Sequence, residues 1–554
     1  MHHLDRIPCP TKPIINQRPK TPQDYKISKP VSLIFKPTNP ETYPQTMAIL
    51  AILLVTFLIT LSLALFLHPK QSQHDRKHKH KHPPGPKPLP IIGNLHMLGK
   101  LPHRSLQVLA KKCGPIMSLK LGQVPAIVAS SPEAAKLFLK THDTIFASRP
   151  IIQASEYLSY GSKGLAFSEY GPYWRNVKKV CTTQLLSGSK VESFAPLRKE
   201  EMGLLVKLLV ESGESGEVVD VSEKVAKLIE NIVFRMILGR SNDDRFDLKG
   251  IVHEAVHLVG NFNLGDYVHL AGALDLMGQV RKFKKISKAY DQVVEHIIKD
   301  HEASSDYNSK HYMDFVDILL SHMNQPKDPQ NEHTHIIDRT NIKAIILDMI
   351  VGAYDTSVTA VEWAMSELLR HPRVMKKLQD ELMSVVGENR QVEEADLVEL
   401  NYLNIVVKET LRLYPVGPLL VPRESQEDVT INGYFIPKKT RVLVNAWAIG
   451  RDPEIWSENA EVFYPERFEN SDIDLCGQYF QLIPFGSGRR GCPGVSLALI
   501  TVGFVLAQLV HCFNWKLPLG MSPDELEMTE NFGLSIPRSK HLLAVPTYRL
   551  FNKA

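Results

Sequence analysis

The sequence predicts a mainly α fold with small β-sheets, in a single large domain that follows an N-terminal transmembrane helix. Apolar residues recur at helical spacing for over thirty residues between 338 and 370, and a second apolar run at 495–510 also reads as a helix. A short stretch rich in β-branched residues, 118–130, favours a small hairpin. At 47–67 the chain is uncharged for 21 residues, which is long enough to cross a bilayer.

The composition is that of an ordinary globular protein. Of 554 residues, 44% are hydrophobic and 23% are charged, so the chain can bury a sizeable core. The net charge of +5 is modest for this length, and we expect no nucleic-acid partner. The 6 cysteines lie far apart, without the regular spacing of a disulfide scaffold. Five of them are therefore expected to be reduced thiols or core residues, in a domain that faces the cytosol.

Residues 1–46 are polar and contain nine prolines, so they are predicted to be disordered. Met47, at the start of the apolar run, has the character of a natural N-terminus. We therefore expect residues 1–46 to be an upstream extension of the gene model. Sequencing the N-terminus of the native protein checks this, because a start at Met1 or His2 would contradict it.

The apolar run at 47–67 is interpreted as a membrane anchor. The alternatives are a cleaved signal peptide and a buried core helix. A signal peptide would end in a small-residue cleavage site, and residues 66–70 offer none. Five lysines and arginines follow between 70 and 81, so the positive-inside rule places the long C-terminal part in the cytoplasm.

Residues 68–90 form a predicted hinge, which is first basic and then proline-rich. The tract 78–82 alternates histidine with lysine, and its lysines would repel a metal cation, so it reads as a solvated linker near anionic lipid headgroups. The prolines between 83 and 90 fix φ and lack N–H donors, which makes a stiff, extended spacer. The folded domain is expected at 91–554.

The stretch 485–494 carries the strongest chemical signal. It places Cys492 between glycines, after two arginines and before the predicted helix at 495–510. A cysteine binds a metal as its thiolate, which needs nearby positive charge or N–H donors, and a helix N-terminus also favours an anion. The glycines let the backbone approach a flat ligand closely. These features suit a buried thiolate on an iron. The alternative is a glycine-rich turn before a core helix, with an inert cysteine.

The spacing Phe485-x-x-Gly488-x-Arg490-x-Cys492-x-Gly494 resembles the haem-ligand signature of the cytochrome P-450 superfamily, the haem-thiolate monooxygenases. The resemblance covers roughly residues 83–546 and implies a single haem-thiolate domain behind the anchor. It implies that Cys492 ligates the iron of haem b (iron protoporphyrin IX), as the axial thiolate that favours O–O cleavage. Further contacts to the haem are implied for Phe485, Gly486 and Gly494, and a propionate contact for Arg490.

The middle of the long helix holds the segment 352–357, Gly-Ala-Tyr-Asp-Thr-Ser. A glycine inside a helix costs about 1 kcal/mol relative to alanine, so it marks a functional or packing reason. Thr356 can bond back to the carbonyl of Gly352 or leave that carbonyl open for a water. The alternative is a buried helix with an incidental Asp-Thr pair.

This segment resembles the family's Ala/Gly-Gly-x-Asp/Glu-Thr-Thr/Ser motif, with Ala353 where a second glycine is common. The resemblance implies that Asp355 and Thr356 are catalytic and deliver the protons for dioxygen cleavage while bulk water stays excluded. We expect the methyl group of Ala353 to narrow the oxygen groove slightly without abolishing activity.

Glu409 and Arg412 lie three residues apart on one face of a predicted helix, where they can pair. The resemblance implies that this pair is buried and that Arg467 joins it, forming a structural scaffold for the haem. Losing one member of a buried triad leaves a charge uncompensated, at a cost of about 3–5 kcal/mol.

Trp174 and Lys178 share a face of another predicted helix. The resemblance implies that both bind a haem propionate. Arginine is usual at the second position, and Lys178 keeps the charge but loses the bidentate fork. The alternative is a surface tryptophan beside solvated lysines. The short apolar segment 416–423 is predicted as a strand edge lining the pocket, and Arg423 at its end fits the position of another propionate partner in the family.

Two later segments complete the predicted pocket. Residues 441–447 read as a further strand. Residues 532–536 form a turn that, by the resemblance, projects into the substrate pocket. We name no substrate contacts between 190 and 335, where the chain reads as mostly helical.

The resemblance is closest to the plant microsomal group. It implies insertion of one oxygen atom from O2 into a small hydrophobic substrate, a phenolic or terpenoid of specialised (secondary) metabolism. An NADPH-dependent cytochrome reductase is the implied electron donor, since the sequence has no flavin or nicotinamide motif of its own. Arg489 is a candidate for guiding its docking. The implied location is the endoplasmic reticulum membrane, single-pass and in contact with lipid, with the catalytic domain facing the cytoplasm.

Two other functions stay open at this point. One is a reductase-independent haem-thiolate isomerase or dehydratase that acts on a hydroperoxide; such proteins often lack the helix threonine, so Thr356 argues against it. The other is a non-catalytic membrane haem protein that binds a ligand or senses a gas. The spectrum of the reduced, CO-bound protein and its NADPH consumption separate the three.

Overall fold

A computed structural model describes residues 42–67, 81–240, 247–260, 262–303, 313–323 and 337–551. The chain divides into two compact units, residues 1–79 and 80–554. The disorder expected at 1–46 lies outside the described residues for 1–41 and is wrong for 42–46, which are helical; the basic half of the hinge, 68–80, also lies outside the described residues.

In the first unit, helix α1 runs from Thr42 to Leu67 and so begins five residues before the predicted span. Its described side chains, 49–61, are apolar except for two threonines, and almost all of them are exposed. The threonine hydroxyls donate to carbonyls one turn back, Thr56 to Ile52 at 2.8 Å and Thr60 to Thr56 at 2.8 Å. The helix therefore offers an apolar surface with its polar groups satisfied internally, as a lipid environment requires.

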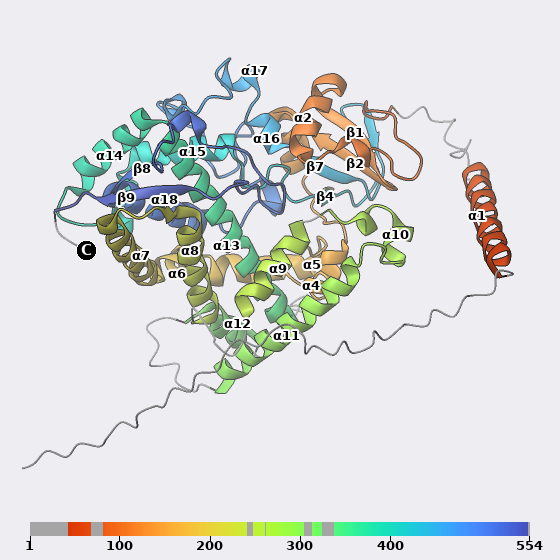
Figure 1. The fold of residues 1–554 in the computed structure, drawn as a ribbon, viewed down its shortest axis with the longest axis horizontal. Helices are drawn as coiled ribbons and strands as arrows, with labels where there is room; N and C mark the ends of the chain where they lie inside the picture. The colour runs from red at the N-terminus through yellow and green to blue at the C-terminus, as the bar shows by residue number, and fades with distance from the viewer. Residues whose placement is uncertain are drawn as a thin grey trace, which may run out of the picture. The chain divides into compact units, whose positions relative to one another are not determined.

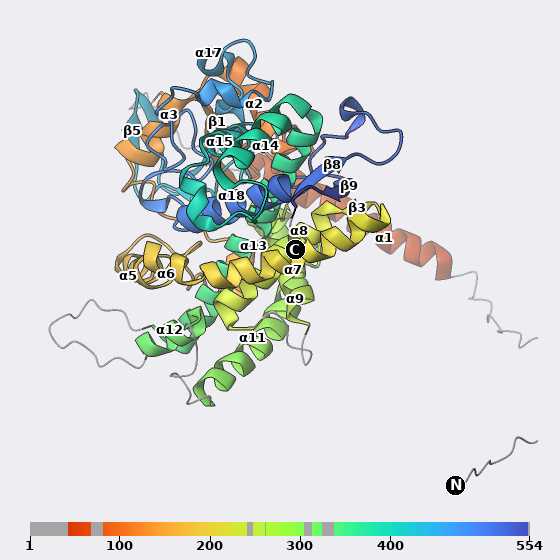
Figure 2. The ribbon, with the colours of Figure 1, turned by 90° about the vertical axis from the view of Figure 1, so that its left-hand side faces the viewer.

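The second unit is mainly helical with small sheets, as predicted (Figures 1 and 2). Its longer helices are α2 (Pro102–Cys113), α5 (Pro172–Val180), α7 (Ala195–Ser215), α8 (Val221–Leu238), α9 (Leu248–Gly260), α11 (Gln279–Ala303), α12 (Phe315–Met323), α13 (Arg339–Arg370), α14 (Pro372–Val386), α15 (Asn401–Leu413) and α18 (Val495–Cys512). The shorter helices are α3 (Pro132–Lys136), α4 (Gln153–Leu158), α6 (Gly188–Ser193), α10 (His269–Ala273), α16 (Ala446–Ile449) and α17 (Pro453–Trp456).

The strands form three sheets with the orders β1-β2-β7-β4, β3-β9-β8 and β5-β6. Their bounds are β1 (Ile116–Leu121), β2 (Val124–Ala129), β3 (Val219–Asp220), β4 (Arg423–Glu424), β5 (Val429–Ile431), β6 (Tyr434–Ile436), β7 (Arg441–Val444), β8 (Phe513–Lys516) and β9 (Leu543–Tyr548). The predicted hairpin at 118–130 is β1 and β2, which pair antiparallel with Ile116 opposite Ala129. Strand β7 joins β2 in parallel, so the hairpin is tied to a segment about 300 residues later.

Helix α13 crosses the middle of the domain (Figure 1) and spans 32 residues, or about 48 Å at 1.5 Å per residue. It begins where the Asp338 carboxylate accepts the N–H of Asn341 at 2.8 Å, which caps the first turn. It ends at Arg370 because Pro372 follows. Helices α13 and α18 are long and apolar enough to cross a membrane, but most of each is buried inside the domain, so both are core helices.

The folded domain starts earlier than the predicted residue 91. The carbonyl of Pro84 accepts the N–H of Ser118 in β1 at 2.8 Å, and that of Lys81 accepts the N–H of Phe435 in β6 at 2.8 Å. Proline lacks an N–H donor but keeps its carbonyl acceptor, so this segment can bond to the edge of a sheet with one side of its backbone. The proline-rich half of the predicted hinge is part of the fold.

Two predicted strands are shorter than expected. Within 416–423 only the last residue, Arg423, enters a strand, and the apolar residues before it line a cavity instead of a sheet. Strand β7 stops at Val444, because the side chain of Asn445 accepts the N–H of Ala448 at 3.0 Å and starts α16.

Candidate active site

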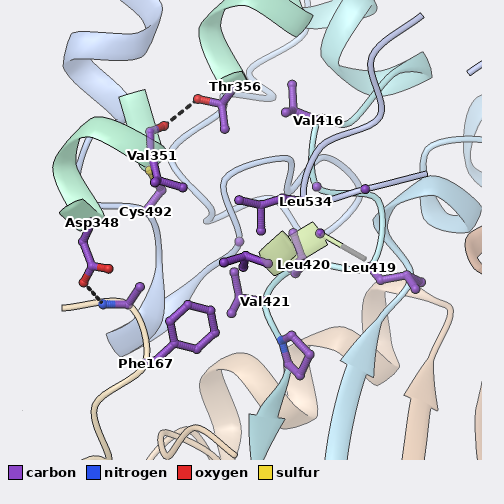
Figure 3. Close-up of a pocket in the computed structure, with 18 of the residues that line it drawn as sticks. Phe167, Asp348, Val351, Thr356, Val416, Leu419, Leu420, Val421, Cys492 and Leu534 are labelled. Carbon is purple, nitrogen blue, oxygen red and sulfur yellow. Dashed lines mark hydrogen bonds between the residues drawn. The ribbon is translucent and has the colours of Figure 1, made fainter. Parts of the chain in front are cut away.

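A cavity of about 1180 Å³ lies in the domain, and most of its lining is apolar. Its walls come from segments far apart in the sequence: the middle of α13, the loop before α18, residues 416–423, and the turn 532–534 (Figure 3). The sequence-predicted turn at 532–536 therefore does reach the cavity. A large apolar cavity with few polar groups is the usual form of a site for a small molecule.

Cys492 stands at the wall of this cavity, immediately before α18. Its N–H donates to the carbonyl of Phe485 at 2.9 Å, which closes the loop 485–492. The thiol is accessible, yet protein surrounds it on its other sides, so its accessible surface faces the cavity. Burial raises the pKa of Cys492, and a hydrogen bond from the N–H of Gly494 acts in the opposite direction. A cation in the cavity would stabilise the thiolate, so the position fits a metal ligand.

The loop needs glycine at one position in particular. Gly488 has φ of +72°, and a Cβ there would collide with the carbonyl oxygen of Leu139. This close approach packs the cysteine loop against the end of the 132–141 helical segment.

Three arginines, Arg149, Arg423 and Arg490, line one edge of the cavity and are all buried. Among the described residues, Arg490 donates only to carbonyls, those of Ala147, Leu165 and Ser168. Within the same ranges Arg149 also donates only to carbonyls, those of Ala166, Val421 and Pro422.

Only Arg423 has an acidic partner in the described structure, Asp143, with its Nη1 3.1 Å from Oδ1. Burial lowers the pKa of all three guanidinium groups, to about 10 for Arg423 and about 9 for Arg490. Repulsion from its arginine neighbours lowers the pKa of Arg149 and of Arg490 further. Buried positive charge in excess of negative charge fits a ligand that carries carboxylates, as a haem carries propionates. The sequence predicted Arg423 and Arg490 but missed Arg149, for which no spacing pointed to this wall.

Trp174 and Lys178 lie in α5 and both line the same edge of the cavity. The indole N–H of Trp174 donates to the carbonyl of Leu165 at 3.1 Å, and the guanidinium of Arg490 lies 4.1 Å from the indole ring centroid. The Lys178 ammonium donates to the carbonyl of Arg489 at 2.5 Å. Burial and the charge of Arg490 lower the pKa of Lys178. Both predicted residues are therefore beside the arginines, and Lys178 adds to the unbalanced positive charge.

On α13, Thr356 faces the cavity and Asp355 does not line it. The Thr356 hydroxyl donates to the carbonyl of Gly352 at 2.7 Å (Figure 3). Of the two arrangements expected from the sequence, this is the one in which the Gly352 carbonyl is occupied by Thr356 and not left open for a water. A Cβ at Gly352 would meet no atom within 4 Å, so the helix surface there is open to the cavity.

The Asp355 carboxylate lies behind Thr356 and accepts a hydrogen bond from the hydroxyl of Ser535. Burial raises the pKa of Asp355, while that hydrogen bond and the charge of His253 lower it. Ser535 comes from the C-terminal loop, 180 residues away in sequence. Sequence reasoning missed this partner because nothing local links the two.

Glu409, Arg412 and Arg467 form the expected buried triad. Glu409 accepts two bonds from Arg412, at 2.7 and 2.8 Å, and two from the Nε of Arg467, at 2.9 and 3.0 Å. Both Glu409 and Arg412 are at most 1% exposed. Arg412 also donates to the carbonyls of Gly450 and Ala460 at 2.5 and 2.6 Å. The triad therefore joins α15 to the segment 450–467, which contains α17.

Asp348 is a further polar residue of the cavity that the sequence did not reveal. Its carboxylate accepts the N–H of Ala166 at 2.9 Å (Figure 3), and that of Leu165 as well. The carbonyls of the same two residues accept bonds from Trp174, Arg490 and Arg149. Asp348 therefore ties α13 to the loop that supports the arginine edge.

The Asp348→Asn variant is expected to change how stability depends on pH. Burial raises the pKa of Asp348 from 3.8 to about 6, so the folded protein binds this proton more tightly than the unfolded chain does. The free energy of unfolding of the wild type therefore falls as pH rises between those two values. The full pKa shift would correspond to about 3 kcal/mol, and this is an upper limit because the side of the carboxylate that faces the cavity is accessible and its charge is screened. Asparagine keeps an acceptor for the N–H groups and cannot ionise.

The measurement for this prediction is the midpoint of thermal unfolding of both proteins at about pH 4.5 and about pH 7.5. The variant should gain stability relative to the wild type at the higher pH. An equal difference at both pH values would contradict the assigned charge state.

Comparisons with known proteins agree with this geometry. The sequence matches the family described as Cytochrome P450 over residues 83–545. It is 58% identical over 461 residues to Cytochrome P450 CYP736A12 of Panax ginseng, covering 83% of this chain and 92% of that protein. It is 43% identical over 459 residues to a costunolide synthase of Tanacetum parthenium, covering 82% of this chain and 91% of that protein.

A solved structure of a zebra fish cytochrome P450 with progesterone is also similar. The TM-score is 0.69 at 25% sequence identity, over 80% of this chain and 99% of that one. The similarity of fold thus extends over nearly all of the solved chain.

Proposed function

The chain belongs to the cytochrome P450 family and is a monooxygenase of that family, and on this premise we propose that it is a membrane-anchored haem-thiolate enzyme of plant specialised metabolism. It inserts one oxygen atom from O2 into a small hydrophobic substrate, a phenolic or terpenoid. A germacrene A hydroxylase of Barnadesia spinosa is 43% identical to this chain, which supports a terpenoid as the substrate. Family membership implies a haem-iron cofactor, and haem b is the form that we propose.

The observation that carries this proposal is the pairing of an accessible cysteine sulfur with unbalanced positive charge across one cavity. Cys492 would hold the iron, and Arg149, Arg423 and Arg490, with Trp174 and Lys178, would hold the propionates. Phe485, Gly486 and Gly494 shape the cavity wall around the sulfur, and Glu409, Arg412 and Arg467 hold the segments behind it. Haem bound there supplies the activation of dioxygen, which the side chains alone cannot perform.

The protein's own residues supply protons and exclude water. Thr356 presents a hydroxyl to the cavity and can exchange its bond to Gly352 for a water or a reacting oxygen. Asp355 stands behind it and can restore protons to that site. The apolar wall of Val416, Leu420 and Leu534 (Figure 3) keeps bulk water away from the reaction.

Electrons come from a redox partner, which we propose to be an NADPH-dependent, membrane-bound cytochrome reductase. Arg489 lies in the cysteine loop with its side chain 47% exposed, and Arg175 and Lys179 are exposed on α5. These cations suit an acidic partner that must approach the sulfur side of the haem.

We propose that the enzyme is held in the endoplasmic reticulum membrane with its catalytic domain in the cytoplasm. The exposed apolar surface of α1 supports an anchor at 47–67, flanked on its C-terminal side by basic residues. The described part of the connection between α9 and α11 exposes five large apolar side chains, which favours contact with lipid: Phe262, Leu270, Leu274, Leu276 and Met277.

The test of the proposed function uses the full chain with haem and a reductase. We expect the red-shifted Soret band of a thiolate ligand in the reduced, CO-bound spectrum, and NADPH consumption that rises when a substrate is added. A panel of phenolics and terpenoids, screened for a low-to-high-spin shift, should identify the substrate class. Turnover of a hydroperoxide without reductase would instead favour an isomerase or dehydratase.

Replacing Thr356 with alanine is expected to lower product formed per NADPH by about tenfold and to release more hydrogen peroxide, because the cavity loses its proton-donating hydroxyl. Thr356→Ser keeps a hydroxyl and should retain most of the coupling. Product, NADPH and peroxide are measured in the same reaction. Equal coupling in the alanine variant and the wild type would exclude Thr356 from proton delivery.

A further inference from the structure

An exposed histidine is hydrogen-bonded to the tyrosine that precedes Asp355, and both His253 and Tyr354 lie close enough to that carboxylate to interact with it electrostatically. Tyr354 precedes Asp355 on α13, and its hydroxyl lies 3.1 Å from Nε2 of His253 on α9. The two rings meet edge to face, with centroids 5.2 Å apart at 63°. The side chain of His253 is 56% exposed. A solvent-exposed imidazole is thus bonded to the phenol next to Asp355.

Two charged side chains lie close to this imidazole. Glu230 of α8 lies 4.0 Å from His253 Nε2 through one carboxylate oxygen, and its other oxygen accepts from the ammonium of Lys249 at 2.6 Å. Burial and the charges of Glu230 and Asp355 raise the pKa of Tyr354 well above its usual value. The phenol therefore stays neutral and can both accept and donate a proton. On α9, Lys249 and His257 lie one turn to either side of His253, and Glu230 on α8 and Tyr354 and Asp355 on α13 are charged or titratable groups near it.

The two carboxylate oxygens of Asp355 differ in their hydrogen bonding. Ser535, which is 2% exposed, donates to Oδ2 and lies 3.4 Å from the hydroxyl of Thr359. Oδ1 has no hydrogen bond to any residue within the described ranges. Because Asp355 lies behind the cavity wall, this oxygen can be reprotonated without opening the cavity to water.

We propose that His253 and Tyr354 are the solvent end of a proton route to Asp355 and Thr356, which enters from the α9 side and bypasses the substrate cavity. Nε2 of His253 gives a proton to the Tyr354 hydroxyl, which releases its own toward Asp355, and His253 takes its next proton from solvent. In each turnover one substrate molecule, one O2, two electrons from the reductase and two protons yield one oxygenated product and one water. The inference rests on the proposed monooxygenase function.

The variants that test the route are His253→Gln and Tyr354→Phe, made in the full chain with haem and reductase. Each removes one proton carrier and leaves the cavity lining unchanged. We expect turnover to fall by about tenfold in each, with a larger solvent isotope effect in D2O and an unchanged substrate-induced spin shift. His257→Gln, one turn later on α9 and also exposed, is the matched control and should behave as the wild type.

A second measurement does not depend on turnover. Infrared titration follows the carboxyl band of Asp355, which is assigned by its loss in Asp355→Asn. Because the charge of His253 lowers the pKa of Asp355, His253→Gln should move the titration midpoint to higher pH.

The outcomes separate the two proposals. A wild type without the thiolate CO band and without NADPH-dependent product would overturn the monooxygenase function. An active wild type whose His253→Gln and Tyr354→Phe variants keep turnover and isotope effect within about twofold would overturn the proton route alone. An unmoved infrared midpoint would also overturn it. Tyr354→Phe keeps the ring and its packing, so it decides the matter if His253→Gln should fold poorly.

Discussion

Glu409→Ala protein is expected to be unable to retain haem. The substitution leaves two buried guanidinium groups, those of Arg412 and Arg467, without the carboxylate that accepts four hydrogen bonds from them. An uncompensated buried charge costs about 3–5 kcal/mol, which is a large part of the stability of a typical domain. Helix α15, which carries two members of this triad, packs against α18 and contributes Leu411 to the cavity wall, so the loss should spread to the haem site.

Haem content per protein and the midpoint of thermal unfolding check this prediction. Asp380→Ala is the matched control, because Asp380 pairs with Lys376 on an exposed face of α14, with side chains 59% and 69% exposed. Such a pair contributes at most about 1 kcal/mol, so the control should keep its haem. Glu409→Ala protein with normal haem content would contradict the structural role of the triad.

Cys492→Ser should remove the monooxygenase activity and the thiolate spectrum together. A serine hydroxyl is a far weaker donor to iron than a thiolate, so the electron density that favours O–O cleavage is lost. We expect activity to fall by at least about 10³-fold, which corresponds to about 4 kcal/mol of activation free energy. The red-shifted Soret band of the reduced, CO-bound protein should disappear.

Cys476→Ser is the control for this substitution, because Cys476 is an exposed thiol that does not line the cavity. It should leave the spectrum and the activity unchanged. If Cys492→Ser kept the red-shifted band, the sulfur ligand would have to come from another cysteine.

Local patterns in the sequence were sufficient to predict the long elements and the cysteine loop. Helix α13 follows from apolar periodicity, the hairpin β1-β2 from its β-branched content, and the pair Glu409 and Arg412 from helical spacing. Arg467, in contrast, was identified only through the family resemblance, because no local pattern relates it to a carboxylate 58 residues earlier.

The residues that the sequence did not reveal act through contacts between distant segments. Arg149 donates hydrogen bonds to the carbonyls of residues 421 and 422, and Asp348 accepts one from the loop at 165–166. Ser535 donates one to Asp355. Each is an ordinary residue in its own segment and acquires a role only when the chain folds. The segment 416–423 was correctly expected to line the pocket, but most of it was misread as a strand because a run that lines a cavity has the same composition as a buried strand.

The hydrogen bonds of the proline segment bear on how a soluble form of the enzyme should be made. Deleting residues up to 90, at the boundary read from the sequence, would strip Ser118 and Phe435 of their carbonyl acceptors and expose the edge of the sheet. It would also remove Gly85, whose position against the Ser118 carbonyl leaves no room for a side chain. A truncated enzyme should therefore keep the chain from about residue 80, so that helix α1 is removed and the sheet edge stays covered.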